Sequence, residues 1–153
     1  MISRPSCSRL LEVVRTELQS TVAPAVTDPG VAAVLGMIDS VLQNVGARCD
    51  HEVAWMRDEI AEIEDVARDV IDAGVDTGSR VSDALTRLRT HRSPSDHTSD
   101  VQAEYDLAGE VLSRALEAAL PCGGDLRDRV RSVLEHRLRR EVEIRGDFTV
   151  IGR

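Results

Sequence analysis

The sequence predicts an all-α protein, a bundle of five helices, or of six if the longest one breaks near Gly46. Apolar residues recur about every 3.5 positions over long stretches, where a helix repeats at roughly 3.6 and a coiled-coil seam at roughly 3.5. The five prolines fall where this pattern stops, as their missing N–H requires. With one Trp, one Tyr and one Phe in 153 residues, the core must be aliphatic.

The first helix is expected to run from about Ser6 or Ser8 to Val22, with Leu11, Val14 and Leu18 on one face. A short connection follows that begins at Pro24. It ends at Asp28-Pro29, where an N-cap aspartate precedes a proline at the first helical position.

A single long helix is predicted over about residues 29–73, bent or broken near Gly46. Its apolar row comprises Val31, Val34, Ile38, Val41, Val45, Cys49, Val53, Met56, Ile60, Ile63, Ala67 and Val70. At ~1.5 Å per residue the helix would be about 66 Å long, whereas a compact domain of this size is only about 40 Å wide. Either the helix bends, or it projects and a second copy of the chain covers its row. We therefore predict a homodimer.

The second half of this helix is the candidate interaction region. Its apolar surface would be Val53, Met56, Ile60 and Ile63, for which an intramolecular core is an equal alternative. A candidate acidic face is formed by Asp58, Glu59, Glu62 and Asp65.

Three more helices are expected after the long one, over Ser79–Thr90, Ser99–Leu120 and Asp125–Arg145. Ser99 and Gln102 have the spacing of a capping box. The last helix carries a candidate basic stripe of Arg127, Arg131 and Arg139, which forms either a salt-bridged exposed face or a surface for an acidic partner. Residues 1–146 are predicted to form one helical domain, and residues 147–153 a tail whose Phe148, Val150 and Ile151 alternate.

Composition narrows the class of protein. A net charge of −8 argues against binding nucleic acid or an anionic membrane as the main task. The three cysteines, without a CxxC spacing, are typical of free thiols in a reducing compartment. No stretch of signal-peptide or transmembrane length is evident, so a cytoplasmic protein is predicted.

The sequence contains no recognisable catalytic or cofactor-binding motif, and we predict no catalytic, cofactor-binding or metal-binding residue. A carboxylate-bridged metal site in a bundle needs Glu-x-x-His pairs, and Glu135 and His136 are adjacent instead. His91, Asp96 and His97 share a loop that either binds a metal or transfers a proton, or is simply solvated; the solvated interpretation is favoured.

The N-terminal part of the chain resembles a known group. Arg4-Pro5, Leu10-Leu11, Val14 and Leu18, followed by a long apolar helix with a carboxylate-rich half, are similar to a bacterial family of small uncharacterised helical proteins. These are encoded beside aminoglycoside-phosphotransferase-like kinases and acyl-CoA dehydrogenases. The resemblance covers residues 4–72 and implies an accessory role with a kinase-like or acyl-CoA-metabolising partner.

The leading hypothesis is therefore a non-enzymatic accessory or protein-interaction bundle. The alternatives are a bundle, possibly enzymatic, that binds a small apolar ligand or acyl chain in an aliphatic cavity with Met37 or Met56, and a carboxylate metal-binding protein.

Overall fold

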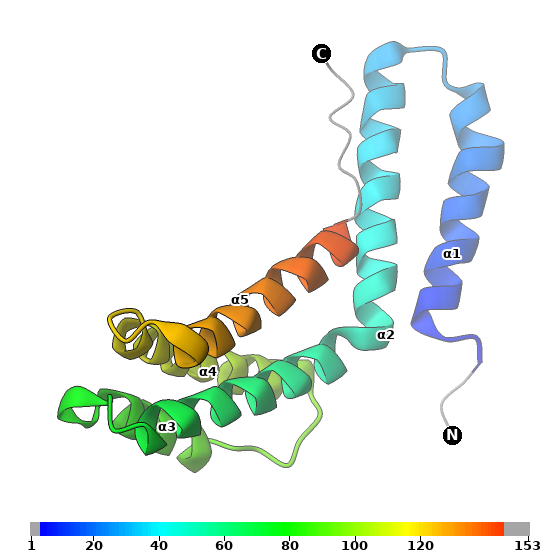
Figure 1. Cartoon of the computed structure of the whole chain (residues 1–153). Helices are drawn as coiled ribbons and strands as arrows, with labels where there is room; N and C mark the ends of the chain where they lie inside the picture. The colour runs from blue at the N-terminus through cyan, green and yellow to red at the C-terminus, as the bar shows by residue number, and fades with distance from the viewer. Residues whose placement is uncertain (1–3, 146–153) are drawn as a thin grey trace. The chain divides into compact units, whose positions relative to one another are not determined.

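The computed structural model describes residues 4–145, and it confirms the all-α prediction with one long helix (Figure 1). Within this range every regular element is helical. In chain order the elements are α1 (Cys7–Glu17), a π-helical turn (Leu18–Val22), a 3-10 turn (Ala23–Ala25), α2 (Pro29–Asp72), a second 3-10 turn (Thr77–Ser79), α3 (Arg80–Thr90), α4 (Thr98–Ala119) and α5 (Gly124–Arg145). The predicted tail, with Phe148, Val150 and Ile151, lies outside the described residues.

Two aspartates hold the starts of helices. The backbone N–H of Val31 donates to Asp28 Oδ1 over 3.1 Å, which caps α2 as predicted. Before α3, the carboxylate of Asp76 accepts the N–H of Val81 at 2.9 Å and the hydroxyl of Ser82 at 2.6 Å. Partial burial raises the pKa of Asp76, but the hydrogen bonds from Ser82 and the backbone outweigh it and hold the pKa below its ordinary value.

The predicted capping box at the start of α4 is wrong. The helix begins at Thr98, one residue earlier than Ser99, and His97 at the N-cap makes no side-chain capping bond. Gln102 donates to Asp106 over 3.0 Å, one turn further on, instead of reaching back to the cap. A glutamine inside a helix can bond to an acceptor four residues further on. The spacing of Ser99 and Gln102 was therefore not specific for a capping box.

Helix α2 continues through Gly46 without interruption, which selects the five-helix alternative. Gly46 has open space where a Cβ atom would stand, with no atom within 4 Å outside its own helix backbone. No close approach of another element accounts for this glycine.

The described chain forms two compact units, each treated separately below. The N-terminal unit contains residues 4–52 with 142–145, and the core unit contains residues 53–141. The prediction of a single domain over residues 1–146 stays a prediction.

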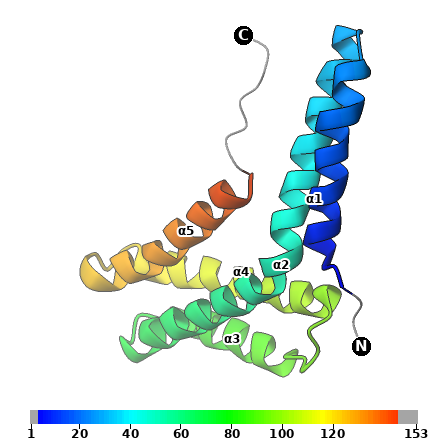
Figure 2. The same ribbon diagram turned by 90° about the vertical axis from the view of Figure 1, so that its right-hand side faces the viewer.

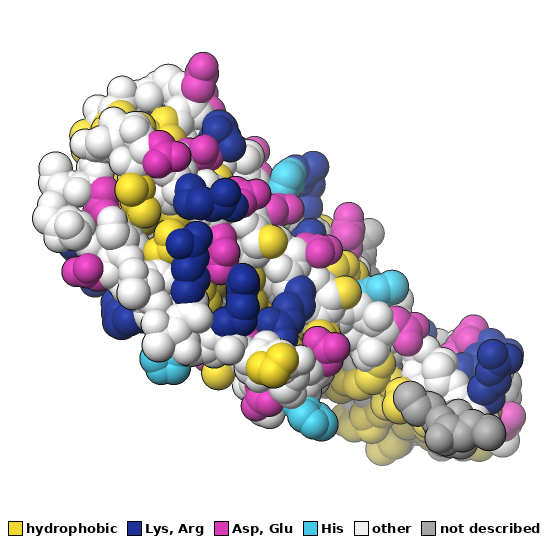
Figure 3. All heavy atoms as spheres, turned by 90° about the horizontal axis from the view of Figure 1, so that it is seen from below, with side chains coloured by type: hydrophobic (Ala, Val, Ile, Leu, Met, Phe, Trp, Pro, Cys, Tyr) yellow, Lys and Arg dark blue, Asp and Glu magenta, His cyan; other side chains and the backbone are white. Residues whose placement is uncertain are grey.

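The core unit packs the second part of α2 with α3, α4 and most of α5 (Figures 1 and 2). Its core is aliphatic, as the composition predicts. The side chains that are buried in it include Ile60, Ile63, Val70, Val81, Leu85, Leu88, Val111, Leu112, Val130 and Val133. Figure 3 shows acidic and basic side chains interspersed on one face of this unit.

We predict that Gly46→Ala raises the free energy of unfolding by roughly 0.5–1 kcal/mol, because alanine loses less backbone entropy in a continuous helix and meets no neighbour here. Urea unfolding followed by circular dichroism measures the change. Gly74→Ala is the control and must destabilise the protein, since Gly74 has a φ of +71° after the end of α2. A loss of stability in Gly46→Ala would mean that α2 is not regular at this position.

Candidate functional site

The N-terminal unit contains an antiparallel helical hairpin, made of α1 and the first half of α2 (Figure 1). A charged pair lies in its seam. Arg15 donates from Nε to Asp39 Oδ1 over 2.8 Å and from Nη2 to Oδ2 over 3.1 Å. Gln19 adds a third bond to Asp39 Oδ2 at 2.9 Å. The hydrogen bond from Arg15 holds the pKa of Asp39 below its ordinary value, so the pair is ionised at neutral pH.

Helix α1 meets α2 through side chains that are half-buried in the seam. They are Leu11 and Arg15 on α1, Leu18 at the start of the π-helical turn that continues it, and Leu35, Asp39 and Leu42 on α2. Two antiparallel helices in contact are related by an approximate twofold axis perpendicular to both. Residues with the same sequence offset from the contact positions therefore lie on the same side of the hairpin.

One side of the hairpin is apolar, because the residue that precedes a seam position is aliphatic in most cases. We call this surface the apolar face; it consists of Leu10 and Val14 on α1 and of Val31, Val34, Ile38, Val41 and Val45 on α2. Each of these side chains is between 41% and 58% exposed. Figure 3 shows hydrophobic side chains at the surface of the hairpin. The predicted apolar row of α2 is thus uncovered in its first half.

The opposite side of the hairpin is polar or small. It consists of the residues that follow the seam positions: Glu12 and Thr16 on α1, Gln19 in the π-helical turn, and Gly36, Ser40 and Gln43 on α2. An open groove of about 460 Å³ lies in this unit, lined mainly by polar side chains such as Arg9, Glu12, Arg15 and Asp50. Such a lining does not suit an acyl chain, which needs an enclosed aliphatic cavity.

The hairpin has no core of its own. None of the described residues of the N-terminal unit is buried; the first buried side chain along α2 is Met56, in the core unit. Two packed helices whose apolar side chains all remain partly in water gain little from burial. The apolar face is therefore an aliphatic surface that α1 and α2 leave about half exposed to solvent.

The predicted interaction surface in the second half of α2 is corrected by the structure. Met56, Ile60 and Ile63 are 6%, 2% and 0% exposed, and Val53 is half-buried. Helices α3, α4 and α5 of the same chain cover this part of the row, which is the intramolecular-core alternative.

The predicted acidic face is divided by the structure. Asp58 and Asp65 are exposed, and Asp65 pairs with Arg68 of the same helix. His136 Nδ1 lies 3.3 Å from Glu62 Oε2, and Glu59 is buried. The acidic residues therefore do not form one continuous exposed surface.

The predicted basic stripe of Arg127, Arg131 and Arg139 is exposed and makes its polar contacts within α5.

A different set of arginines contacts α2 in the core unit. Arg129 Nη2 lies 2.6 Å from Asp69 Oδ2, Arg137 Nε lies 3.6 Å from Glu59 Oε1, and Arg140 Nη1 donates to the carbonyl of Trp55 over 3.1 Å. The sequence contained a signal that Arg137 and Arg140 face inward. Leu126, Val130 and Val133 define the inner row of α5, and positions 137 and 140 continue this row at steps of four and three.

Glu59, Tyr105 and Arg137 form a polar cluster at the edge of this core. Tyr105 donates its hydroxyl to Glu59 Oε2 over 3.0 Å, and the guanidinium of Arg137 lies 5.0 Å from the centre of the Tyr105 ring. Glu59 Oε1 is buried and accepts no hydrogen bond from the described residues. Burial raises the pKa of Glu59 above its ordinary value; burial, then the charge of Glu59, raises the pKa of Tyr105 to about 12.

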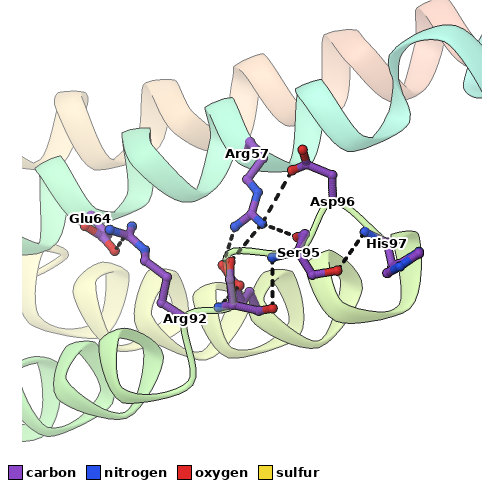
Figure 4. A network of polar contacts seen from close by, with 8 residues as sticks. Arg57, Glu64, Arg92, Ser95, Asp96 and His97 are labelled. Carbon is purple, nitrogen blue, oxygen red and sulfur yellow. Dashed lines mark hydrogen bonds and ion pairs between the residues drawn. The ribbon is translucent and has the colours of Figure 1, made fainter.

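A second polar network holds the loop between α3 and α4 (Figure 4). Arg57 on α2 donates to Glu104 Oε2 at 2.7 Å, and to the carbonyls of Ser93 at 3.1 Å and Ser95 at 2.7 Å. Glu104, only 1% exposed, accepts the Ser93 N–H through its other oxygen at 2.5 Å. Arg92 is bound at 2.7 Å by Glu64 of α2. The network explains why a charged residue, Glu104, is tolerated at a buried position of α4 where an apolar residue would be expected.

The histidines of this loop are exposed. His91 Nδ1 lies 2.9 Å from the carbonyl of Arg87, and Asp96 lies 3.8 Å from Arg57. Over residues 4–145, no three His, Cys, Asp or Glu side chains are grouped so as to hold a metal ion.

Comparisons of the chain with protein-family models, with curated proteins and with solved structures gave no match. The resemblance of residues 4–72 to a bacterial family stays a prediction. By length and composition, α2 is apolar enough in its first part to cross a membrane, a criterion that core helices of soluble proteins also meet.

We predict that Glu104→Ala lowers the free energy of unfolding by about 3 kcal/mol or more, because Arg57 then loses the partner of a part-buried pair. Chemical denaturation measures the loss. Asp65→Ala is the matched control and should change the free energy by no more than about 0.5 kcal/mol, since its pair with Arg68 is exposed. Equal effects of the two substitutions would contradict the assignment.

We predict a distinct pH dependence from Glu59. Because its folded pKa is raised, protonation of Glu59 favours the folded chain, and this contribution is fully present below the unfolded pKa and lost as pH rises through the folded pKa. The free energy of unfolding of the native protein minus that of Glu59→Gln should therefore fall as the pH rises above about 4, the ordinary pKa of a glutamate. Parallel urea titrations measure the difference. A difference that rises with pH would show that Arg137 and Tyr105 dominate over burial.

Proposed function

We propose that this chain is a non-enzymatic protein-interaction module whose working surface is the apolar face of the hairpin. The observation that carries the proposal is the contrast within one helix. From Met56 to Val70 the apolar row of α2 is buried by its own chain, whereas from Val31 to Val45 it is about half exposed. A contiguous exposed apolar patch on a folded chain is often a functional surface.

The division of charge supports the same proposal. The seven residues of the apolar face include no charged side chain, while the opposite side of the hairpin carries Glu12 and the polar groove. A dry centre with polar surroundings is the composition of a protein interface. In the core unit, Arg129, Arg137 and Arg140 of α5 make contacts with α2, so part of the charge of α5 is neutralised or hydrogen-bonded within the unit.

Cysteine footprinting tests the proposal. In a background with Cys7, Cys49 and Cys122, which are all exposed, changed to serine, a single cysteine is placed at Val41→Cys or at Ser40→Cys. Both positions are exposed on the isolated chain but lie on opposite sides of the hairpin. In an extract of the native host, a maleimide should react at least about tenfold more slowly at position 41, because a protein covers the apolar face.

Equal reaction rates at the two positions in the extract would contradict the proposal, because the apolar face would then be bare in the presence of every protein of the cell. Rates measured after addition of denaturant correct for any intrinsic difference between the two thiols.

A further inference from the structure

We infer that the occupant of the apolar face is the same face of a second copy of this chain, so that two hairpins form a four-helix bundle about a twofold axis. This inference rests on the proposed function and names its partner.

The spacing of the apolar face matches a helical partner. On α2 the residues Val31, Val34, Ile38, Val41 and Val45 follow one another at steps of three, four, three and four. This is the heptad spacing of a seam that receives the side chains of another helix. All five are β-branched, with few rotamers to lose when they become packed.

Helix α2 carries a second seam next to this one. Leu35, Asp39 and Leu42 are spaced at four and three residues, and Arg15 of α1 binds Asp39 in that seam. A helix with two adjacent seams is typical of a four-helix bundle, in which each helix contacts two neighbours. The hairpin supplies two of the four helices, and one seam remains to be filled.

The size of the face suits a copy of itself. Seven aliphatic side chains, each about half exposed, offer on the order of 500 Å² of apolar surface. A standard interface buries about 800 Å² of each partner, of which about 60% is apolar. The apolar area that each partner buries is therefore similar to the apolar area of this face. Its seven side chains are uncharged and meet no electrostatic penalty when they pack against their own copies, whereas Glu17 on the same side must stay at the solvated rim.

Charged residues limit the face at its edges. Glu17 of α1 precedes the seam position Leu18 and so lies on the apolar side. Along α2, Arg48 and Glu52 continue the heptad spacing after Val45 and pair with each other. A rim of this kind remains hydrated around a protein interface, whereas a lipid bilayer would have to bury Glu17 and the Arg15–Asp39 pair. These charges favour a second copy over a membrane.

Sedimentation velocity of the full chain tests the inference. We expect a dimer at micromolar concentration, at least a hundredfold weaker dimerisation in Ile38→Asp, and an unchanged dimer in Ser40→Asp on the opposite side of the hairpin. Far-UV circular dichroism checks that the variants stay helical. If Ile38→Asp unfolds the hairpin, Val41→Thr replaces it: this variant keeps the shape of the side chain and should weaken the dimer about tenfold.

Three results would overturn the inference. A native chain that stays monomeric, although position 41 is protected in the host extract, would assign the face to a different protein and leave the proposed function standing. A dimer that Ile38→Asp and Val41→Thr leave intact would place the dimer contact elsewhere. Flotation of the purified chain with vesicles of a neutral and an anionic phospholipid, abolished by Ile38→Asp, would assign the face to lipid.

Discussion

The length of the apolar row on α2 is the constraint on which the rest of the structure depends. A row that extends from Val31 to Val70 needs neighbouring helices along its whole length, and the chain supplies them unevenly. Helices α3, α4 and α5 bury the part from Met56 onward, whereas α1 contacts the earlier part only on an adjacent seam. One periodic pattern therefore gives a closed core in one unit and an open surface in the other.

Charge has a different role in each unit. In the core unit, arginines of α5 and Arg57 of α2 reach buried carboxylates and backbone carbonyls, so that they specify which helix faces meet. In the hairpin, Arg15 and Asp39 form a single pair within an otherwise leucine-rich seam. A shift of α1 along α2 by one turn would separate this pair and leave two charges half-buried without partners, so the pair fixes the alignment of the hairpin.

Much of the fold was predictable from the sequence, because helix boundaries depend on local chemistry. Asp28-Pro29 marks the start of α2, and proline or glycine lies at each of the breaks. Which residues are covered was less predictable. Met56 and Val41 belong to the same apolar row of α2, and only the packing of α3, α4 and α5 makes one buried and the other exposed. Likewise, arginines occur on every side of α5, so its inward-facing row was hard to recognise in the sequence. The apolar residues at 126, 130 and 133 define that row.

The network around Arg57 has a consequence for how the loop between α3 and α4 varies. Arg57 binds the carbonyl oxygens of Ser93 and Ser95, which every amino acid possesses, and not their hydroxyl groups. The path of the loop is therefore encoded by a side chain 36 positions earlier in the chain, and the loop's own sequence is free to diverge. Related chains with unlike loops would be recognised by an arginine on the long helix and an acidic residue at an inner position of α4.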